Sequence, residues 1–300
     1  MAQRLAGPDE LARCRNQCAG YHLHPPSRKG RVISTRADQS VECKQSHVLL
    51  LTDVRGSQHK APQVRDARAG GVLLVGPTDP AIAHLEATGM PLVLVEHHVP
   101  GRAFDCVLSD NFAGGRLAAE HLINAGHQHI AFISGPALDA RRPMSTLAPV
   151  ELRANGYRTA LLDAVLPIDY ALYEPSNLTP EGGYLACKRL LQRDVEFTAL
   201  FCANDSTAVG ALKALREAGR SVPGDVSLVA YGDYMDIAAQ LTPALTTVHT
   251  DQVGAGMVAV QRLITRAARP ELPRLLHLLH VELVQRESVR PPIGDGTAQR

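Results

Sequence analysis

Short apolar runs alternate with longer amphipathic segments along most of this chain. The runs that predict buried strands are His47–Leu51, Gly71–Gly76, Pro91–Val95, Ile130–Ile133, Thr198–Cys202, Val226–Tyr231 and His280–Val284. Helical spacing predicts a helix after Asp110 and further helices over Val150–Ala164, Thr179–Leu191, Ser206–Ala218 and Asp251–Ala267. Strands of this length between helices of ten or more residues predict parallel βαβ units and an α/β fold.

The segment from Asp110 to Pro136 carries the clearest local signals. Asp110 and Asn111 can accept hydrogen bonds from the first-turn N–H groups of a helix, and Gly126 stands where a helix C-cap is expected. The apolar run Ile130–Ile133 then predicts a strand that is buried on both faces.

Composition narrows the class of protein. The chain has 300 residues, 45% of them apolar and 20% charged, which is typical of a globular protein of about two domains. A net charge of +1 gives no whole-chain argument for binding nucleic acid or a membrane. There is no transmembrane run, no signal-peptide core at the N-terminus and no disulfide framework among the six cysteines, so we expect a cytoplasmic protein.

Parallel sheets bind ligands at the carboxyl ends of their strands, which directs attention to the residues after each strand. These are Ser109-Asp110, Ser134-Gly135, Ala203-Asn204-Asp205 and Gly232-Asp233. Carboxylates there can accept hydrogen bonds from the hydroxyls of a sugar or polyol, and Arg153 can clamp a carboxylate or a pair of hydroxyls. The alternative is that Asp110 and Asp205 only cap helices.

Five segments of the chain resemble the effector-binding module of the bacterial LacI/GalR transcription regulators. They are VLSDNFAGGRLAAEHLINAGHQHIAFISGP, ELRANGYRTAL, ALFCANDSTAVGALKALREAGRSVPGDVSLVAYGD, LTPALTTVHTD and VELVQRESVRPP. The resemblance covers residues 46–292 and leaves 293–300 as a tail. It implies a periplasmic-binding-protein-like fold of type I, with two doubly wound parallel-sheet subdomains joined by crossover strands. The first would span about 46–136 plus part of 243–292, and the second about 137–242.

The resemblance also implies a function and a site. In this family a sugar, sugar phosphate or nucleobase binds in the cleft between the subdomains. Arg153 matches the effector-contacting arginine of the family's R-x-x-G motif, and Asn204 with Asp205 matches its N-D pair. Asp233 lies near an acidic family position, although the segment that follows is one residue longer than usual.

One position of the site departs from the family pattern. Several members stack an aromatic residue on the effector where this chain has Leu178. Tyr184, Tyr231 or Tyr234 could take over that role, or could be ordinary core and rim residues. In the loop Ala137–Val150, Arg141 and Arg142 could favour an anionic effector such as a sugar phosphate, or could be surface residues of the loop.

The first 45 residues depart most from the family, because the helix–turn–helix signature is absent. Val32 and Ile33 are the only β-branched pair that could replace the module's first strand, and Lys60–Ala69 is a weak helix that contains Pro62. Residues 1–40 hold seven Lys or Arg against three acidic residues, which could form a basic arm or an unselected tail. We hypothesise a truncated or frame-shifted gene start, which the upstream nucleotide sequence would test.

The N-terminal segment also contains a loose zinc-like pattern, Cys14, Cys18, His22 and His24. The spacing fits no common zinc finger, so we interpret it as incidental and expect no metal. No catalytic triad or phosphate-binding loop is found, and no cofactor is expected.

Three functional readings follow. The first is a regulator whose effector controls operator binding by a homodimer. The second is a stand-alone cytoplasmic sugar-binding module, or a dominant-negative partner without DNA binding of its own. The third is an enzyme, for which the sequence offers no catalytic constellation.

Overall fold

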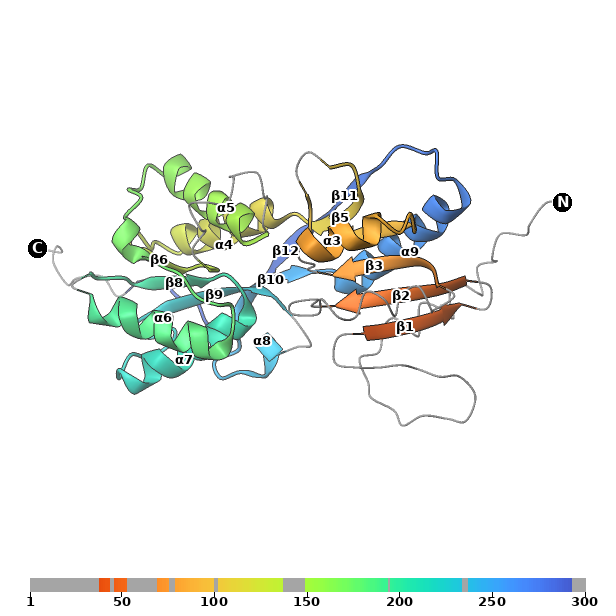
Figure 1. Cartoon of the computed structure of the whole chain (residues 1–300). Coiled ribbons are helices and arrows are strands. Elements are labelled where there is room, and N and C mark those ends of the chain that lie inside the picture. The colour runs from red at the N-terminus through yellow and green to blue at the C-terminus, as the bar shows by residue number, and fades with distance from the viewer. Residues whose placement is uncertain are drawn as a thin grey trace, which may run out of the picture. The chain divides into compact units, whose positions relative to one another are not determined.

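The computed structural model describes residues 38–43, 46–52, 69–75, 79–99, 102–136, 149–193, 195–233 and 237–292. These residues divide into two compact units (Figure 1). The first unit contains the described residues up to Ser109 together with Asp251–Leu279, and the second contains Asp110–Thr250 and the residues from His280. Each unit is therefore built from separate stretches of the sequence.

A six-stranded sheet forms the centre of the first unit. In spatial order its strands are β1 (Asp38–Cys43), β2 (Ser46–Thr52), β3 (Ala69–Val75), β4 (Leu92–Val95), β5 (Asp105–Ser109) and β11 (Leu276–Leu279). Strand β1 is antiparallel to β2, and the other neighbours are parallel. Helix α3 (Asp79–Glu86) packs Ile82 and Leu85 on one face, and α9 (Gln252–Ala268) packs Ala259 and Leu263 on the other.

The second unit has its own six-stranded sheet with helices on both faces. In spatial order its strands are β12 (Val281–Val284), β10 (Thr246–Thr250), β9 (Ser227–Gly232), β8 (Ala199–Cys202), β6 (Ile130–Ile133) and β7 (Tyr173–Glu174). All neighbours are parallel except β12 and β10. A 3-10 helix spans Tyr170–Leu172 and the short helix α8 spans Ile237–Gln240.

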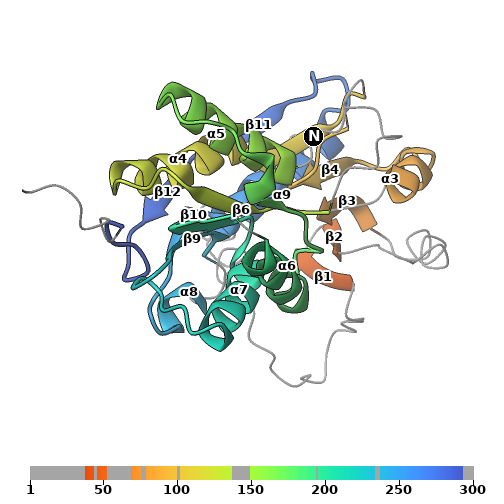
Figure 2. The same ribbon diagram turned by 90° about the vertical axis from the view of Figure 1, so that its left-hand side faces the viewer.

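Two pairs of helices cover the two faces of this sheet (Figure 2). Helices α4 (Asn111–Asn124) and α5 (Pro149–Asp163) pack on one core cluster, which includes Phe132 and Phe201. Helices α6 (Pro180–Gln192) and α7 (Asp205–Glu217) pack on the other, which includes Leu200 and Leu228. The doubly wound α/β fold is confirmed.

Three of the predicted helix ends are confirmed. The carboxylate of Asp110 accepts from the Ala113 backbone N–H, and the Thr179 hydroxyl accepts from that of Gly182. Gly126 follows the C-terminus of α4 with φ at +98°, a left-handed conformation that favours glycine.

Several features differ from the sequence-based expectation. The last strand was predicted over His280–Val284, but the structure begins it at Val281, as β12 of the second sheet. The residues just before it, Leu276–Leu279, form β11 of the first sheet. A continuous apolar run cannot show where a chain changes sheets. The polar strand β1 and the short helix α3 were not predicted. The division between the units lies at Ser109 rather than near Pro136, because β6 pairs with β8 and α4 packs against α5.

Several sequence-based interpretations concern residues outside the described part of the chain. They are the pair Val32 and Ile33, most of Lys60–Ala69, the Cys14, Cys18, His22 and His24 pattern, Arg141, Arg142 and Tyr234. No helix in the described ranges is both long enough and apolar enough to cross a membrane.

One buried carboxylate joins the end of α9 to the first sheet. Asp105, which is fully buried, accepts from Arg262 Nε at 2.6 Å, Arg266 Nε at 2.7 Å and the Leu275 backbone N–H at 3.0 Å. Arg266 also donates to the Leu272 carbonyl at 2.6 Å, which closes the C-terminus of the helix. Burial by itself would raise the pKa of Asp105, but the hydrogen bonds from Arg266 and Arg262 outweigh it and hold the pKa below its ordinary value.

Replacing this carboxylate should strongly destabilise the first unit. We expect Asp105→Asn to lower the free energy of unfolding by about 3–5 kcal/mol at pH 7, because it leaves two buried guanidinium groups without their anion. Urea denaturation measures the change. The matched control is Asp163→Asn, which removes an exposed partner of Arg116 and should cost less than about 1 kcal/mol. Equal losses in the two variants would refute the assigned role.

A buried histidine fixes the C-terminal segment to the second sheet. His127 is 2% exposed, with Nε2 2.9 Å from the Arg290 carbonyl oxygen and Nδ1 2.9 Å from the Thr198 hydroxyl. A carbonyl can only accept, so Nε2 carries the proton and Nδ1 accepts from Thr198. Burial lowers the pKa of His127, and the neighbouring His121 lowers it further.

The stability of the protein should therefore fall in mild acid. Below about pH 6.5 the unfolded chain takes up a proton at His127 that the folded chain does not, so stability is lost as the pH falls through that range. The slope for this one group is at most about 1.4 kcal/mol per pH unit. His127→Gln should flatten the pH dependence of urea denaturation between pH 8 and 5.5, whereas the exposed His84→Gln should not. An unchanged slope in His127→Gln would contradict the assignment.

Candidate functional site

The carboxyl edge of the second sheet brings together most of the residues that the sequence singled out. Strands β6, β8, β9 and β10 run parallel, so their C-terminal ends meet at one edge. Ala203 and Asn204 follow β8, and Asp233 follows β9. Ligands bind at this edge in open α/β sheets.

Arg153, on the first turns of α5, is held at this edge by three different elements. Its Nε donates to the Asn111 side-chain oxygen at 2.8 Å, and one terminal nitrogen donates to the Ala203 carbonyl at 2.6 Å. The guanidinium carbon lies 3.8 Å from the centre of the Tyr231 ring, which is a close cation–π contact. Taken as a whole residue, Arg153 is half-buried.

Glycines in the two helices allow Arg153 to reach this position. Gly156 lies one turn after Arg153, and a Cβ there would overlap the Phe112 carbonyl on α4. A Cβ on Gly115 would overlap the carbonyl of Arg153 itself. The backbones of α4 and α5 are therefore in direct contact, and this contact places Arg153 beside Asn111.

Asn204 uses both ends of its amide within the protein. Its oxygen accepts from the Thr207 backbone N–H at 2.8 Å, which caps α7, and its nitrogen donates to the Leu178 carbonyl at 3.0 Å. Leu178 has φ at +63°, a left-handed conformation that is costly for a leucine. The hydrogen bond from Asn204 thus helps to hold a strained turn at the sheet edge.

Each of the three predicted carboxylates accepts a hydrogen bond from the protein. Asp110 caps α4 by accepting from Ala113, as described above. Asp205 is 3% exposed and accepts from the Thr247 hydroxyl at 2.8 Å. Asp233 accepts from Arg286 at 3.0 Å with both oxygens, and His249 Nδ1 lies 3.4 Å from it. The predicted capping role holds for Asp110, whereas Asn204 rather than Asp205 caps α7.

Of the candidate tyrosines, the two that the structure describes, Tyr184 and Tyr231, do not provide an exposed platform for a sugar. Tyr231 is 2% exposed and lies against the Arg153 guanidinium. The hydroxyl of Tyr184 donates to Glu217 at 2.7 Å on the outer side of α6 and α7. Tyr231 therefore supports the arginine, and the structure places Tyr184 in a helix–helix contact.

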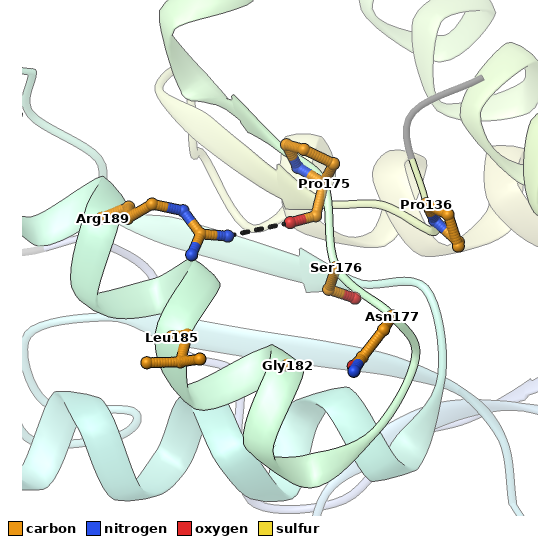
Figure 3. A pocket seen from close by; sticks show the side chains of 7 residues that line it. All are labelled: Pro136, Pro175, Ser176, Asn177, Gly182, Leu185 and Arg189. Atoms are coloured by element: carbon orange, nitrogen blue, oxygen red, sulfur yellow. Dashed lines mark hydrogen bonds between the residues drawn. The ribbon is translucent and has the colours of Figure 1, made fainter. Parts of the chain in front are cut away.

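A hollow of about 360 Å³ lies beside the segment Pro175–Asn177 and helix α6 (Figure 3). It is lined by Pro136, Pro175, Ser176, Asn177, Gly182, Leu185 and Arg189. Arg153 does not line this hollow. The arginine that does line it, Arg189, donates to Glu174 and to the Pro175 carbonyl. Since its charged group is already engaged, this hollow is a weaker candidate for ligand recognition than the surroundings of Arg153.

The sequence missed the partners that fix these groups. It assigned Asn111 to a helix cap, but the Asn111 oxygen accepts from Arg153. It gave Arg286 no role, although Arg286 binds Asp233 across 53 residues of sequence. The only available signal was the position of Arg286 after a predicted strand. Within the described ranges, no cluster of three or more His, Cys, Asp or Glu side chains could hold a metal ion.

Comparison with known proteins places the chain among bacterial regulators. The family model of the periplasmic binding protein-like domain matches residues 119–289. A probable HTH-type transcriptional repressor, ExuR of Bacillus subtilis (strain 168), is 30% identical over 230 residues, which cover 76% of this chain and 66% of the relative. The chain spans between 57% and 66% of the length of the first curated relatives it matches.

Solved structures give the same picture. The transcriptional regulator CelR in complex with cellobiose matches with a TM-score of 0.69 and 33% identity, over 76% of this chain and 68% of that one. A LacI family regulator from Enterococcus faecium with bound ribose matches with a TM-score of 0.68 and 29% identity, over 78% and 85% of the two chains.

The Asp233–Arg286 pair should behave as a structural unit. We expect Asp233→Asn and Arg286→Gln each to lower the free energy of unfolding by about 1–3 kcal/mol, because each leaves a largely buried charged partner without its counter-charge. The double variant should lose little more than either single one, because both changes remove the same interaction. Urea denaturation of the three variants forms the double-mutant cycle. Additive losses would show that the two side chains act independently.

Proposed function

The chain belongs to the LacI/GalR family of bacterial transcription regulators, and from this membership we propose that the carboxyl edge of its second sheet binds a small-molecule effector. The observation that carries the proposal is the geometry of Arg153. Its guanidinium group is half-buried, oriented by Asn111, Ala203 and Tyr231, and positioned where parallel sheets bind ligands. It is also the residue that matches the family's effector-contacting arginine.

The other predicted residues complete the proposed site. Arg153 contacts the effector directly, and the remaining members hold the edge in shape around it. They are Asp110, Leu178, Asn204, Asp205 and Asp233. Cellobiose and ribose are the ligands of two similar regulators. By analogy, the effector of this chain is a sugar or sugar derivative.

Effector binding would act through a conformational equilibrium. In the proposed mechanism the protein is a cytoplasmic homodimer, and the effector shifts it between states that differ in affinity for operator DNA. A ligand achieves this only by binding one state better than the other. No catalytic step is assigned, since the similar proteins are regulators.

The effector site is tested by a thermal-shift screen of the full chain against sugars, sugar phosphates, polyols and nucleobases. A ligand at 100 times its dissociation constant should stabilise the folded state by about 2.7 kcal/mol. Arg153→Ala should abolish the shift, whereas Arg116→Ala, which changes an exposed arginine on α4, should keep it. The melting temperature without ligand shows whether each variant is folded. A folded Arg153→Ala that binds as well as the original chain would refute the proposed site.

A further inference from the structure

Hydrogen-bond acceptors at the candidate site are already engaged within the protein. Asp205 accepts from Thr247, and Asp233 accepts from Arg286 with both oxygens. The Asn204 oxygen caps α7. A neutral sugar presents many hydroxyl donors and needs acceptors for them. Part of the acceptor capacity of this site is therefore taken up by the protein itself.

The hydrogen-bond donors that remain without a partner among the described residues of the site belong to Arg153. A guanidinium group has five N–H donors. Within the described part of the chain, two of those of Arg153 are used, and their partners Asn111 and Ala203 are neutral oxygens. Arg286, at the same end of the unit, differs because its charge is matched by Asp233. Arg153 is thus a half-buried cation with no carboxylate partner among the described residues.

The unused donors are held in a fixed orientation. The guanidinium carbon lies 3.8 Å from the centre of the Tyr231 ring, and the hydrogen bonds from Nε and one terminal nitrogen anchor two more points of the group. For the other terminal nitrogen, Nη2, the described residues provide no hydrogen-bond acceptor. A planar guanidinium group held in this way matches the paired oxygens of a carboxylate or a phosphate.

We propose that the effector of this protein is an anion, whose carboxylate or phosphate group accepts hydrogen bonds from the free side of Arg153. The inference rests on the proposed function and narrows its ligand class. A small hydroxylated acid and a phosphate ester share the required chemistry, because each offers several acceptor oxygens and a negative charge. The anion supplies the counter-charge that no residue in the described part of the chain gives to Arg153.

The test compares neutral and anionic forms of the same sugar on the full chain by isothermal titration calorimetry. The neutral ligands are glucose and galactose. The anionic ligands are glucuronate, galacturonate and glucose 6-phosphate, with inorganic phosphate as a further arm. We expect an anionic form to bind roughly tenfold to hundredfold more tightly than its neutral counterpart. The affinity should fall as the NaCl concentration rises. Comparison of the acids with the ester identifies the anionic group.

Variants separate charge from geometry at Arg153. Arg153→Lys keeps the charge but loses the planar fork, so it should bind the anion more weakly and retain some preference over the neutral sugar. Arg153→Gln should remove the preference. The control Arg116→Gln changes an exposed arginine of the same unit and should leave the affinities unchanged. The melting temperature of each variant without ligand is measured alongside.

The possible results distinguish this inference from the function on which it rests. Tight binding of a neutral sugar with no gain for its acid or ester would overturn the anionic ligand and leave the effector site standing. Binding of none of the ligands, in this set or in the wider thermal-shift screen, would overturn both. An anion preference that survives in a folded Arg153→Gln, or that does not respond to salt, would place the anion elsewhere.

Discussion

Backbone contact between α4 and α5 is the constraint on which the candidate site depends. With a side chain at Gly156, α5 could not lie against the Phe112 carbonyl. With a side chain at Gly115, α4 could not lie against the Arg153 carbonyl. Without this contact the two helices would separate by the width of at least a methyl group. The hydrogen bonds of Arg153, at 2.8 and 2.6 Å, leave no room for such a shift. The glycine of the R-x-x-G motif is therefore as necessary to the site as its arginine.

The same arrangement recurs on the other face of the sheet. A Cβ on Gly183 of α6 would overlap the Thr207 backbone, and one on Gly210 of α7 would overlap the Pro180 carbonyl. Thr207 is also the residue whose N–H is capped by Asn204. Close helix contacts on the two faces thus fix Arg153 from one side and the start of α7 from the other. The positions of these polar groups follow from backbone contact rather than from the length or flexibility of their side chains.

Local signals in the sequence were sufficient for most of the second unit, but not for the roles of its polar residues. Asp110, Thr179 and Gly126 identify helix ends because the groups they satisfy lie within a few residues. The roles of Asp233 and Asp205 depend on Arg286 and Thr247, which lie 53 and 42 residues away. The break between β11 and β12 was hidden for a similar reason, because strand pairing with β5 and β10 decides it and the apolar run does not.

A polar side chain at the end of a strand therefore identifies a ligand contact only after its protein partners are known. Judged only by the types of its residues, the predicted site has three carboxylates (Asp110, Asp205 and Asp233) and one arginine (Arg153). That composition indicates a site that accepts hydrogen bonds from hydroxyls. The hydrogen bonds of the structure give a different picture. The carboxylates accept from groups of the protein itself, whereas among the described residues Arg153 keeps donors without a partner. The carboxylates and Asn204 keep the edge rigid, and Tyr231 with Asn111 keeps the guanidinium group in one orientation. A ligand that binds Arg153 then loses little binding free energy to ordering the site. More of the binding free energy can therefore contribute to the difference in affinity between the two states of a regulator.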